Sequence, residues 1–271
     1  MRHRSSLIGI VIIFVLLTAT CPQQAGALAF SQSSSTSNPQ AAQQLGEARR
    51  AEIAGYTTSL QSADEEERRN AVLMLGAMRD PATLTALRAA LKDSAERVRA
   101  AALAGLGNLN DPTLAPVIAI YLTQDKRAFV RKTAAYALGQ VGGSDATAAL
   151  IVGLRDKDME VRGAAAVALS NTPDASAIEP LTRALNDKSP FVRAHAAAAL
   201  GVNGRAAASA VPALVRALAK DDDHEARRQA ATALGRIGEP SARPALERAA
   251  HSSDPYLSEV AREAINLISR Q

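Results

Sequence analysis

The feature that most constrains this chain is a short motif that returns every 31 to 34 residues. Each of six clear copies contains a Leu followed by a small residue, an Arg eight positions before that small residue, and usually an Asp six positions before the Arg. The Arg recurs at Arg68, Arg99, Arg131, Arg162, Arg193 and Arg227. The first copy has Ser62 in place of the Asp, and a seventh copy has Ser258 in place of the Arg. Repetition at this period predicts a stack of similar small units, with divergent units at the ends because each end has one face in water.

Each copy holds two apolar stretches with the spacing of an amphipathic helix. In the third copy these are Leu114, Val117, Ile118, Tyr121 and Leu122, and then Val130, Ala134, Ala137 and Leu138. Pro81 and Pro112 are placed to open first helices, the repeated Asp falls in the turn before the second helix, and the Gly is expected to close that helix in a left-handed conformation. The sequence therefore predicts an all-α fold, a right-handed α-solenoid of about seven helix pairs over residues 45–271.

The apolar composition supports closely packed helices. Hydrophobic residues make up 47% of the chain, but aromatic residues only 3%, and Trp is absent. The apolar fraction is mainly Ala, Leu and Val, and Ala and Leu are strong helix formers. A single large globular core normally uses bulkier aromatic fillers, so this composition suits a stack better.

The N-terminus has the order of an export signal. A basic start is followed by an apolar run from Leu7 to Leu17, too short for a comfortable membrane span, and by small residues before a cleavage site after Ala27 or Ala29. Lipidation at Cys21 and an uncleaved anchor are the alternatives. Residues 31–44 are polar and low in complexity, so a flexible linker is predicted over residues 28–44. We expect an extracytoplasmic protein, periplasmic or secreted, without an integral membrane domain after signal removal.

The charge balance argues against nucleic acid as a partner. The formal net charge is +4, and without Arg2 and Arg4 the 31 basic side chains become 29 against 27 acidic ones. A nucleic-acid surface would need a basic face, and single strands would need aromatic residues to stack on. Cys21 is the only cysteine, so the exported chain has no disulfide and must be stable through packing. We expect a monomer.

The motif Asp-x4-Val-Arg-x2-Ala-Ala-x-Ala-Leu-Gly resembles the HEAT repeat, particularly the short bacterial kind of the phycobilisome lyases. The resemblance covers residues 44–271. It implies that the repeated Asp and Arg form a ladder of hydrogen bonds between turns, which suits Arg because its planar fork can bridge a carboxylate and carbonyls at once. The implied ladder residues are Asp93, Arg99, Asp125, Arg131, Asp156, Arg162, Asp187, Arg193, Asp221 and Arg227. A structural role of this kind is expected in place of a metal or phosphate site.

Catalytic chemistry finds little support in the sequence. His195, His224 and His251 lie in different repeats, with no metal-ligand spacing between them. The pair His224–Glu225 is similar to the His-Glu pairs that hold two irons in deoxyhypusine hydroxylase, a HEAT-repeat enzyme that needs four such pairs. No glycine-rich phosphate loop or Gly-x-Ser-x-Gly elbow occurs. We therefore expect no metal, no cofactor and no enzymatic activity.

The resemblance also implies that the second helices line a concave surface. Positions one, two, five and nine residues after the Arg then face away from the core, and their larger side chains gather in the third, fifth and sixth repeats. The candidate binding residues are Lys132, Tyr136, Gln140, His195, Arg228, Gln229, Thr232 and Arg236. The expected function is a scaffold that binds a protein or peptide on this face. The alternatives are a chromophore-handling enzyme of the phycobilin lyase kind and a lipid-anchored component of envelope assembly.

Overall fold

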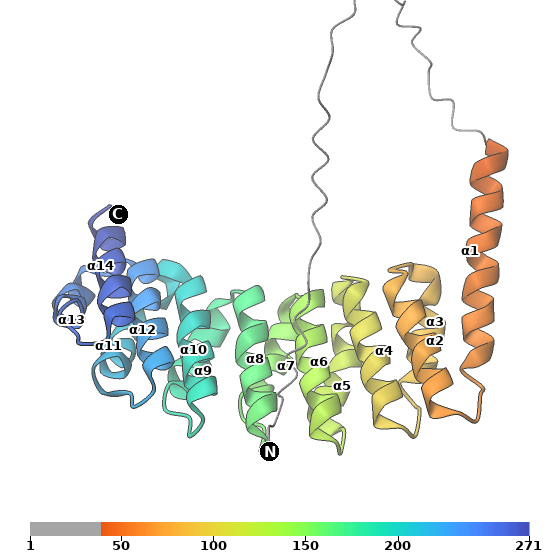
Figure 1. Ribbon diagram of the computed structural model, residues 1–271, viewed down its shortest axis with the longest axis horizontal. Helices are drawn as coiled ribbons and strands as arrows, with labels where there is room; N and C mark the ends of the chain where they lie inside the picture. The colour runs from red at the N-terminus through yellow and green to blue at the C-terminus, as the bar shows by residue number, and fades with distance from the viewer. Residues whose placement is uncertain (1–38, 271) are drawn as a thin grey trace, which may run out of the picture. The chain divides into compact units, whose positions relative to one another are not determined.

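The computed structural model describes residues 39–270, and within them all regular structure is helical (Figure 1). The chain divides into a unit of residues 1–43 and a unit of residues 44–271. The second unit holds nearly all of the described fold. The predicted signal segment and residues 28–38 of the predicted linker lie outside the described residues.

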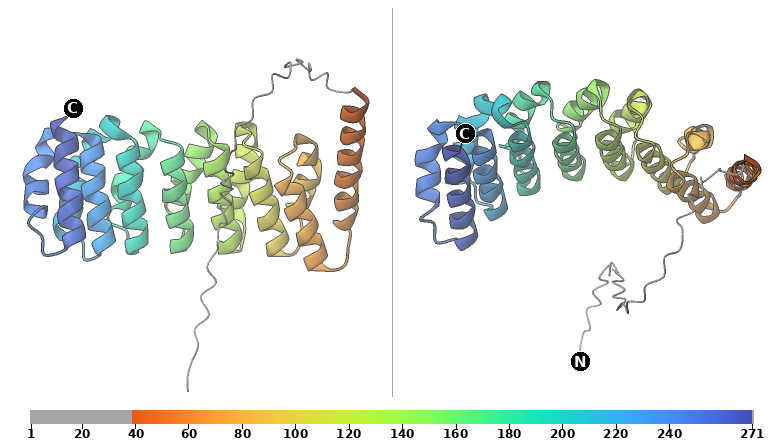
Figure 2. Two further views of the ribbon diagram at one scale, coloured as in Figure 1. Left: turned by 45° about the horizontal axis from the view of Figure 1, so that its top comes forward. Right: turned by 90° about the horizontal axis from the view of Figure 1, so that it is seen from above.

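The helices of the second unit alternate between an outer and an inner row, and the inner row lies on the concave side of the arc (Figure 2). The outer row consists of α3 (Leu84–Ala90), α5 (Ala115–Gln124), α7 (Ser144–Gly153), α9 (Ile178–Ala184), α11 (Val211–Lys220) and α13 (Arg243–Ala249). The inner row consists of α2 (Glu65–Ala77), α4 (Glu96–Asn108), α6 (Ala128–Val141), α8 (Met159–Asn171), α10 (Pro190–Val202), α12 (His224–Ile237) and α14 (Pro255–Ser269). With α1 (Pro39–Ser59) before α2, residues 39–270 form seven helix pairs. The prediction of an all-α solenoid is confirmed.

Five outer helices begin with a 3₁₀ turn. These turns are η1 (Pro81–Thr83), η2 (Pro112–Leu114), η3 (Ala175–Ala177), η4 (Gly204–Ala210) and η5 (Pro240–Ala242). Pro81 and Pro112 open η1 and η2, where the missing N–H of proline has no helical partner to lose. The aspartate before each of these two prolines accepts a backbone N–H of the turn, as Asp80 does from Ala82 at 2.9 Å.

Helix α1 begins earlier than the sequence suggested. The linker was expected to reach residue 44, but α1 starts at Pro39, so residues 39–44 are helical. Proline is suited to a first helical position, and the Ala, Gln, Leu, Glu and Arg residues that follow favour helix. In the second unit, Ile53 and Tyr56 of α1 pack against the core and remain partly exposed, and the Arg49 side chain donates to the Met78 carbonyl oxygen at 3.0 Å.

One hydrophobic core runs between the two rows, from Val72 in α2 to Ile268 in α14. Its largest fully buried side chains are all Leu or Ile, such as Leu75, Leu138 and Leu200. Alanines fill the contacts between neighbouring inner helices. The small-residue core expected from the composition is therefore present, and it is continuous from one repeat to the next.

The repeated glycines have a different role from the one that the sequence suggested. Gly139 has ordinary helical backbone inside α6 and does not close the helix in a left-handed conformation. A Cβ built on Gly139 would lie 2.7 Å from the Cβ of Ala168 in α8, and one on Gly235 would lie 2.7 Å from the Cα of Ala264 in α14. These glycines let successive inner helices approach. The left-handed glycines of the described chain are Gly142, Gly143, Gly204 and Gly238.

Candidate functional site

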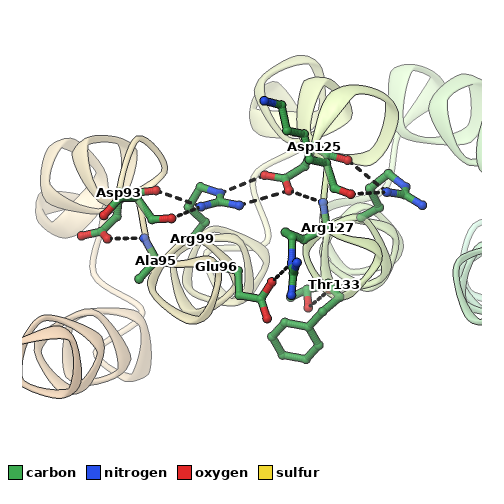
Figure 3. A network of polar contacts seen from close by, with 11 residues as sticks. Asp93, Ala95, Glu96, Arg99, Asp125, Arg127 and Thr133 are labelled. Carbon is green, nitrogen blue, oxygen red and sulfur yellow. Dashed lines mark hydrogen bonds and ion pairs between the residues drawn. The ribbon is translucent and has the colours of Figure 1, made fainter.

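The repeated Arg and Asp side chains connect the turns of successive repeats. Arg99 donates from Nε and Nη2 to the two carboxylate oxygens of Asp125 at 2.8 and 3.1 Å. Its Nη1 donates to the carbonyl oxygens of Asp93 and Ser94 in its own repeat, at 3.0 and 2.9 Å (Figure 3). The rungs of this ladder are Arg68–Asp93, Arg99–Asp125, Arg131–Asp156, Arg162–Asp187 and Arg193–Asp221. Each guanidinium therefore ties two adjacent turns together.

The ladder carboxylates stay ionised because of their hydrogen bonds. Asp156 accepts two bonds from Arg131, at 2.7 and 2.8 Å, and a third from the backbone N–H of Asp158 at 2.8 Å. Burial alone would raise the pKa of Asp156, but the bonds from Arg131 and the Asp158 amide outweigh it, and this pKa lies below its usual range. The hydrogen bond to Asp156 in turn raises the pKa of Arg131. Both partners are occupied, which suits a structural role.

The ladder stops at the sixth inner helix. Arg227 was expected to be a ladder residue, but Ser252 stands where its aspartate would be. The Oγ of Ser252 accepts the backbone N–H of Asp254 at 3.2 Å, as a ladder aspartate would. It offers no carboxylate to the guanidinium. Among the described residues, the buried Nε of Arg227 has no hydrogen-bond partner.

His224 does not replace the missing carboxylate. Its Nδ1 lies 3.0 Å from Nη2 of Arg227 and also 3.0 Å from Oδ2 of Asp254. One ring nitrogen either donates or accepts, so it cannot serve both neighbours. A carboxylate only accepts, so a bond to Asp254 requires the proton on Nδ1, and such a bond lowers the pKa of Asp254. In that arrangement Nδ1 cannot accept a bond from Arg227.

Two of the eight candidate binding residues come together on the concave face. Lys132 and Tyr136 line a surface hollow of about 380 Å³, and its other walls are Met159, Glu160, Ser189 and Phe191. Nζ of Lys132 lies 2.6 Å from Oε2 of Glu160. The Met159 and Phe191 side chains are 58% and 48% exposed, so the hollow presents apolar surface to solvent. We call it the second hollow, because another one lies two repeats earlier in the chain.

The ring of Phe191 packs against a glycine of the preceding inner helix and against His195. A Cβ on Gly163 would lie 2.3 Å from Cε1 of Phe191, so the ring rests directly on the glycine. His195 meets the same ring edge-on, with 4.3 Å between the ring centroids. Burial disfavours the charged imidazole and lowers the pKa of His195, although Glu225 acts in the opposite direction. His195 therefore supports Phe191 and lies beside the hollow.

The remaining candidates lie apart from this hollow. Arg228 and Gln229 bond Glu225 on their own helix, at 3.3 and 2.7 Å, and the Arg228 guanidinium lies 5.3 Å from the ring centroid of Tyr256. Thr232 donates to the carbonyl oxygen of Arg228 at 3.1 Å. The other two lie against glycines of the preceding inner helix: Gln140 against Gly107 and Arg236 against Gly201. The eight residues thus do not form one site.

The sequence-based candidates missed the aromatic residues that most shape this face. These stand two positions before the Arg, at the start of each inner helix. In repeat order this position holds Glu66, Arg97, Phe129, Glu160, Phe191, Glu225 and Tyr256. Phe129, Phe191 and Tyr256 are 47%, 48% and 66% exposed. An aromatic residue in every second repeat from the third onward was the available signal.

Another hollow lies two repeats earlier on the same face. It has a volume of about 360 Å³, and we call it the first hollow. Its residues are Arg69, Leu73, Arg97, Ala100, Ala101, Ala104, Phe129 and Thr133. Leu73 and Phe129 are 44% and 47% exposed. The inner row therefore carries two separate apolar depressions with charged rims.

Residues 39–270 also bear on metal binding and on membrane spans. Within this range, His, Cys, Asp and Glu side chains form no group of three or more that could hold a metal ion. Helices with both the length and the apolar character needed to cross a membrane are also absent from this range.

The comparisons with known proteins point to one fold. A family model described as HEAT repeats matches residues 53–139, 119–201 and 178–266. The Escherichia coli protein YibA is 22% identical, with a TM-score of 0.62 and coverage of 82% of both chains. The complex of CpcE and CpcF of phycocyanin lyase from a Nostoc species is 24% identical, with a TM-score of 0.51 and coverage of 80% of this chain and 94% of that one. No curated protein matches the sequence. At these identities the structural similarities show the fold alone.

Proposed function

The chain belongs to the HEAT-repeat family, and on that premise we propose that it is a non-catalytic scaffold that binds a protein or peptide on its concave face. One observation carries the proposal. The inner row exposes large apolar side chains in two hollows, lined by Leu73 and Phe129 in the first and by Tyr136, Met159 and Phe191 in the second. Exposed aromatic and methionine side chains in a depression are typical anchors for a partner.

Site-specific photocrosslinking in the native host tests this proposal. A photoreactive amino acid at Tyr136 or Met159 should give a discrete crosslinked product with a partner. The matched controls are Ile120 and Val152, which are 51% and 55% exposed on the outer helices α5 and α7. They should give none. Equal crosslinking from both rows, or none from the inner row, would contradict a concave binding face.

Export is the second part of the proposal. It is supported by the basic, apolar and small-residue order of residues 1–27. The intact mass of the protein recovered from its host tests it, because cleavage after Ala27 or Ala29 and lipidation at Cys21 give clearly different masses. Recovery of the full-length chain from the cytoplasm would contradict export.

A further inference from the structure

The two hollows on the concave face are built from the same positions of the repeat. Counted from the ladder Arg, each uses the residues one and five positions after it in one repeat, and the residue two positions before it in each of the next two repeats. In the first hollow these are Arg69, Leu73, Arg97 and Phe129. In the second hollow they are Lys132, Tyr136, Glu160 and Phe191. Each hollow thus has a cation, an apolar wall, a second charged residue and a phenylalanine. The residues of the second hollow lie two repeats after those of the first.

The displacement sets a distance between the hollows. Neighbouring packed helices lie about 8–10 Å apart, so two repeats correspond to roughly 16–20 Å. An extended chain rises about 3.3 Å per residue, and only every second side chain points to the same side. Two side chains about six residues apart in one extended segment would therefore enter both hollows from the same face.

The charges differ between the hollows. At the first hollow, Arg69 and Arg97 share the single carboxylate of Glu66, at 3.0 and 3.5 Å. One positive charge there is left without a partner of its own. At the second hollow, Lys132 and Glu160 neutralise each other at 2.6 Å. A complementary segment would carry an acidic residue beside the side chain that enters the first hollow, and none would be needed at the second.

We infer that the partner presents an extended segment with two large apolar side chains about six residues apart and an acidic residue next to one of them. This rests on the proposed concave binding face and specifies what that face recognises. Binding of the first anchor holds the second near its hollow at high effective concentration, so affinity depends on the spacing of the anchors as well as on the anchors themselves.

Selection from a display library of random 14-residue peptides against the purified protein tests the inference. The enriched peptides should share two apolar residues about six apart, with Asp or Glu beside one. For the best peptide, moving the anchors to three apart should weaken binding at least about tenfold, to the level of a single-anchor peptide. Enriched peptides with no common spacing, or no enrichment at all, would overturn the inference.

Variants of the protein then locate the binding. Leu73→Arg and Tyr136→Arg each fill one hollow, at positions that are 44% and 43% exposed. Each variant should bind the two-anchor peptide only as tightly as the parent binds a single-anchor peptide. Ile120→Arg on the outer row is the matched control and should bind as the parent does. Arg97→Glu should change the preference from acidic to basic neighbours of the anchor. If photocrosslinking at Tyr136 succeeds while the peptides show no dependence on spacing, the binding face stands and the two-anchor inference falls.

Discussion

Arg131 and Arg227 occupy the same position of the repeat and have opposite surroundings. Arg131 is 4% exposed and bonds both oxygens of Asp156. Arg227 has no carboxylate, because its repeat is followed by Ser252. The two residues share their chemistry and their place on the inner helix. Substituting each of them therefore separates what a complete rung contributes to the free energy of unfolding from what the packing of a long side chain contributes.

We expect Arg131→Ala to lower the free energy of unfolding by about 1–3 kcal/mol, because Asp156 then loses its charged donor in a partly buried place. Arg227→Ala is the matched control and should cost less than half as much. Thermal or urea unfolding of both variants measures the difference. Equal losses would mean that the packing of the arginine stem carries the stability, and the rung does not.

Restoring the missing rung should stabilise the protein. Ser252→Asp would give Arg227 the carboxylate that the other ladder arginines have, and we expect a gain of about 1 kcal/mol. The spacing to Asp254 is no obstacle, since Asp156 and Asp158 stand in the same relation within an intact rung.

The control for this change is Ser252→Asp in an Arg227→Ala background. If the gain comes from the new pair, it should disappear there, because the two changes are coupled only through their contact. A gain that persists without Arg227 would trace to capping of the turn and would refute the rung.

The residues of the concave face were only partly predictable. Lys132 and Tyr136 were found because helical periodicity places them outside the core. Phe129 and Phe191 were missed because they stand beside a buried Val at the start of the helix, where an aromatic side chain is expected to be buried. Their exposure depends on what the preceding inner helix offers beneath the ring, such as Gly163 under Phe191. That neighbour is 28 positions away, and a single copy of the repeat does not contain it.

At the scale of the helix, close approach decides how the inner row is built. The inner helices touch at glycines and alanines, and a Cβ at Gly76 would lie 2.7 Å from the Cα of Gly105. The helix pairs themselves were predictable because apolar spacing and the repeated motif agree. The role of the repeated glycine was not, since a left-handed helix end and a close contact call for the same residue. Only the position of the neighbouring helix distinguishes the two.

Gly139→Ala should destabilise the protein although alanine favours helix by about 1 kcal/mol over glycine. The added methyl would press on Ala168 in α8, and overpacking of this kind costs about 1–3 kcal/mol. Gly55→Ala in α1 is the control, because a Cβ there meets nothing within 4 Å. Thermal melts should show a lower midpoint for the first variant and no loss for the second. An unchanged midpoint for Gly139→Ala would contradict the close-approach explanation.

At the scale of the whole molecule, the ladder makes the free energy of unfolding depend on pH. In Asp93 the hydrogen bond from Arg68 is the main cause of a lowered pKa. In Asp125, Asp156, Asp187 and Asp221 burial acts to raise the pKa, and the bonds from arginine and backbone outweigh it. All five carboxyls therefore bind protons more weakly in the folded chain than in the unfolded chain.

The sign of the pH effect follows from this difference. The stabilisation is fully present above the unfolded pKa of about 3.9 and is lost as the pH falls through the lower folded values. We expect the melting temperature to be nearly constant between pH 7 and 5 and to fall steeply below about pH 4. Arg131→Ala should show a shallower fall, since one pair is already broken. A parent and variant with parallel pH profiles would contradict a contribution from this pair.

The missing rung also has a mechanical consequence. A tensile load applied to the two ends of the stack passes through every junction in series, so the first junction to yield is the one with the fewest fasteners. Five junctions are clamped by a ladder rung, in which a guanidinium bonds a carboxylate at 2.6–2.8 Å. The junction between α12 and α14 has no rung, and its polar contacts are the longer pair of Arg228 with Asp254, at 3.6 Å, and the contact of His224 with Asp254. Under tension, α13 and α14 should peel away first, while the clamped repeats and their two hollows stay assembled.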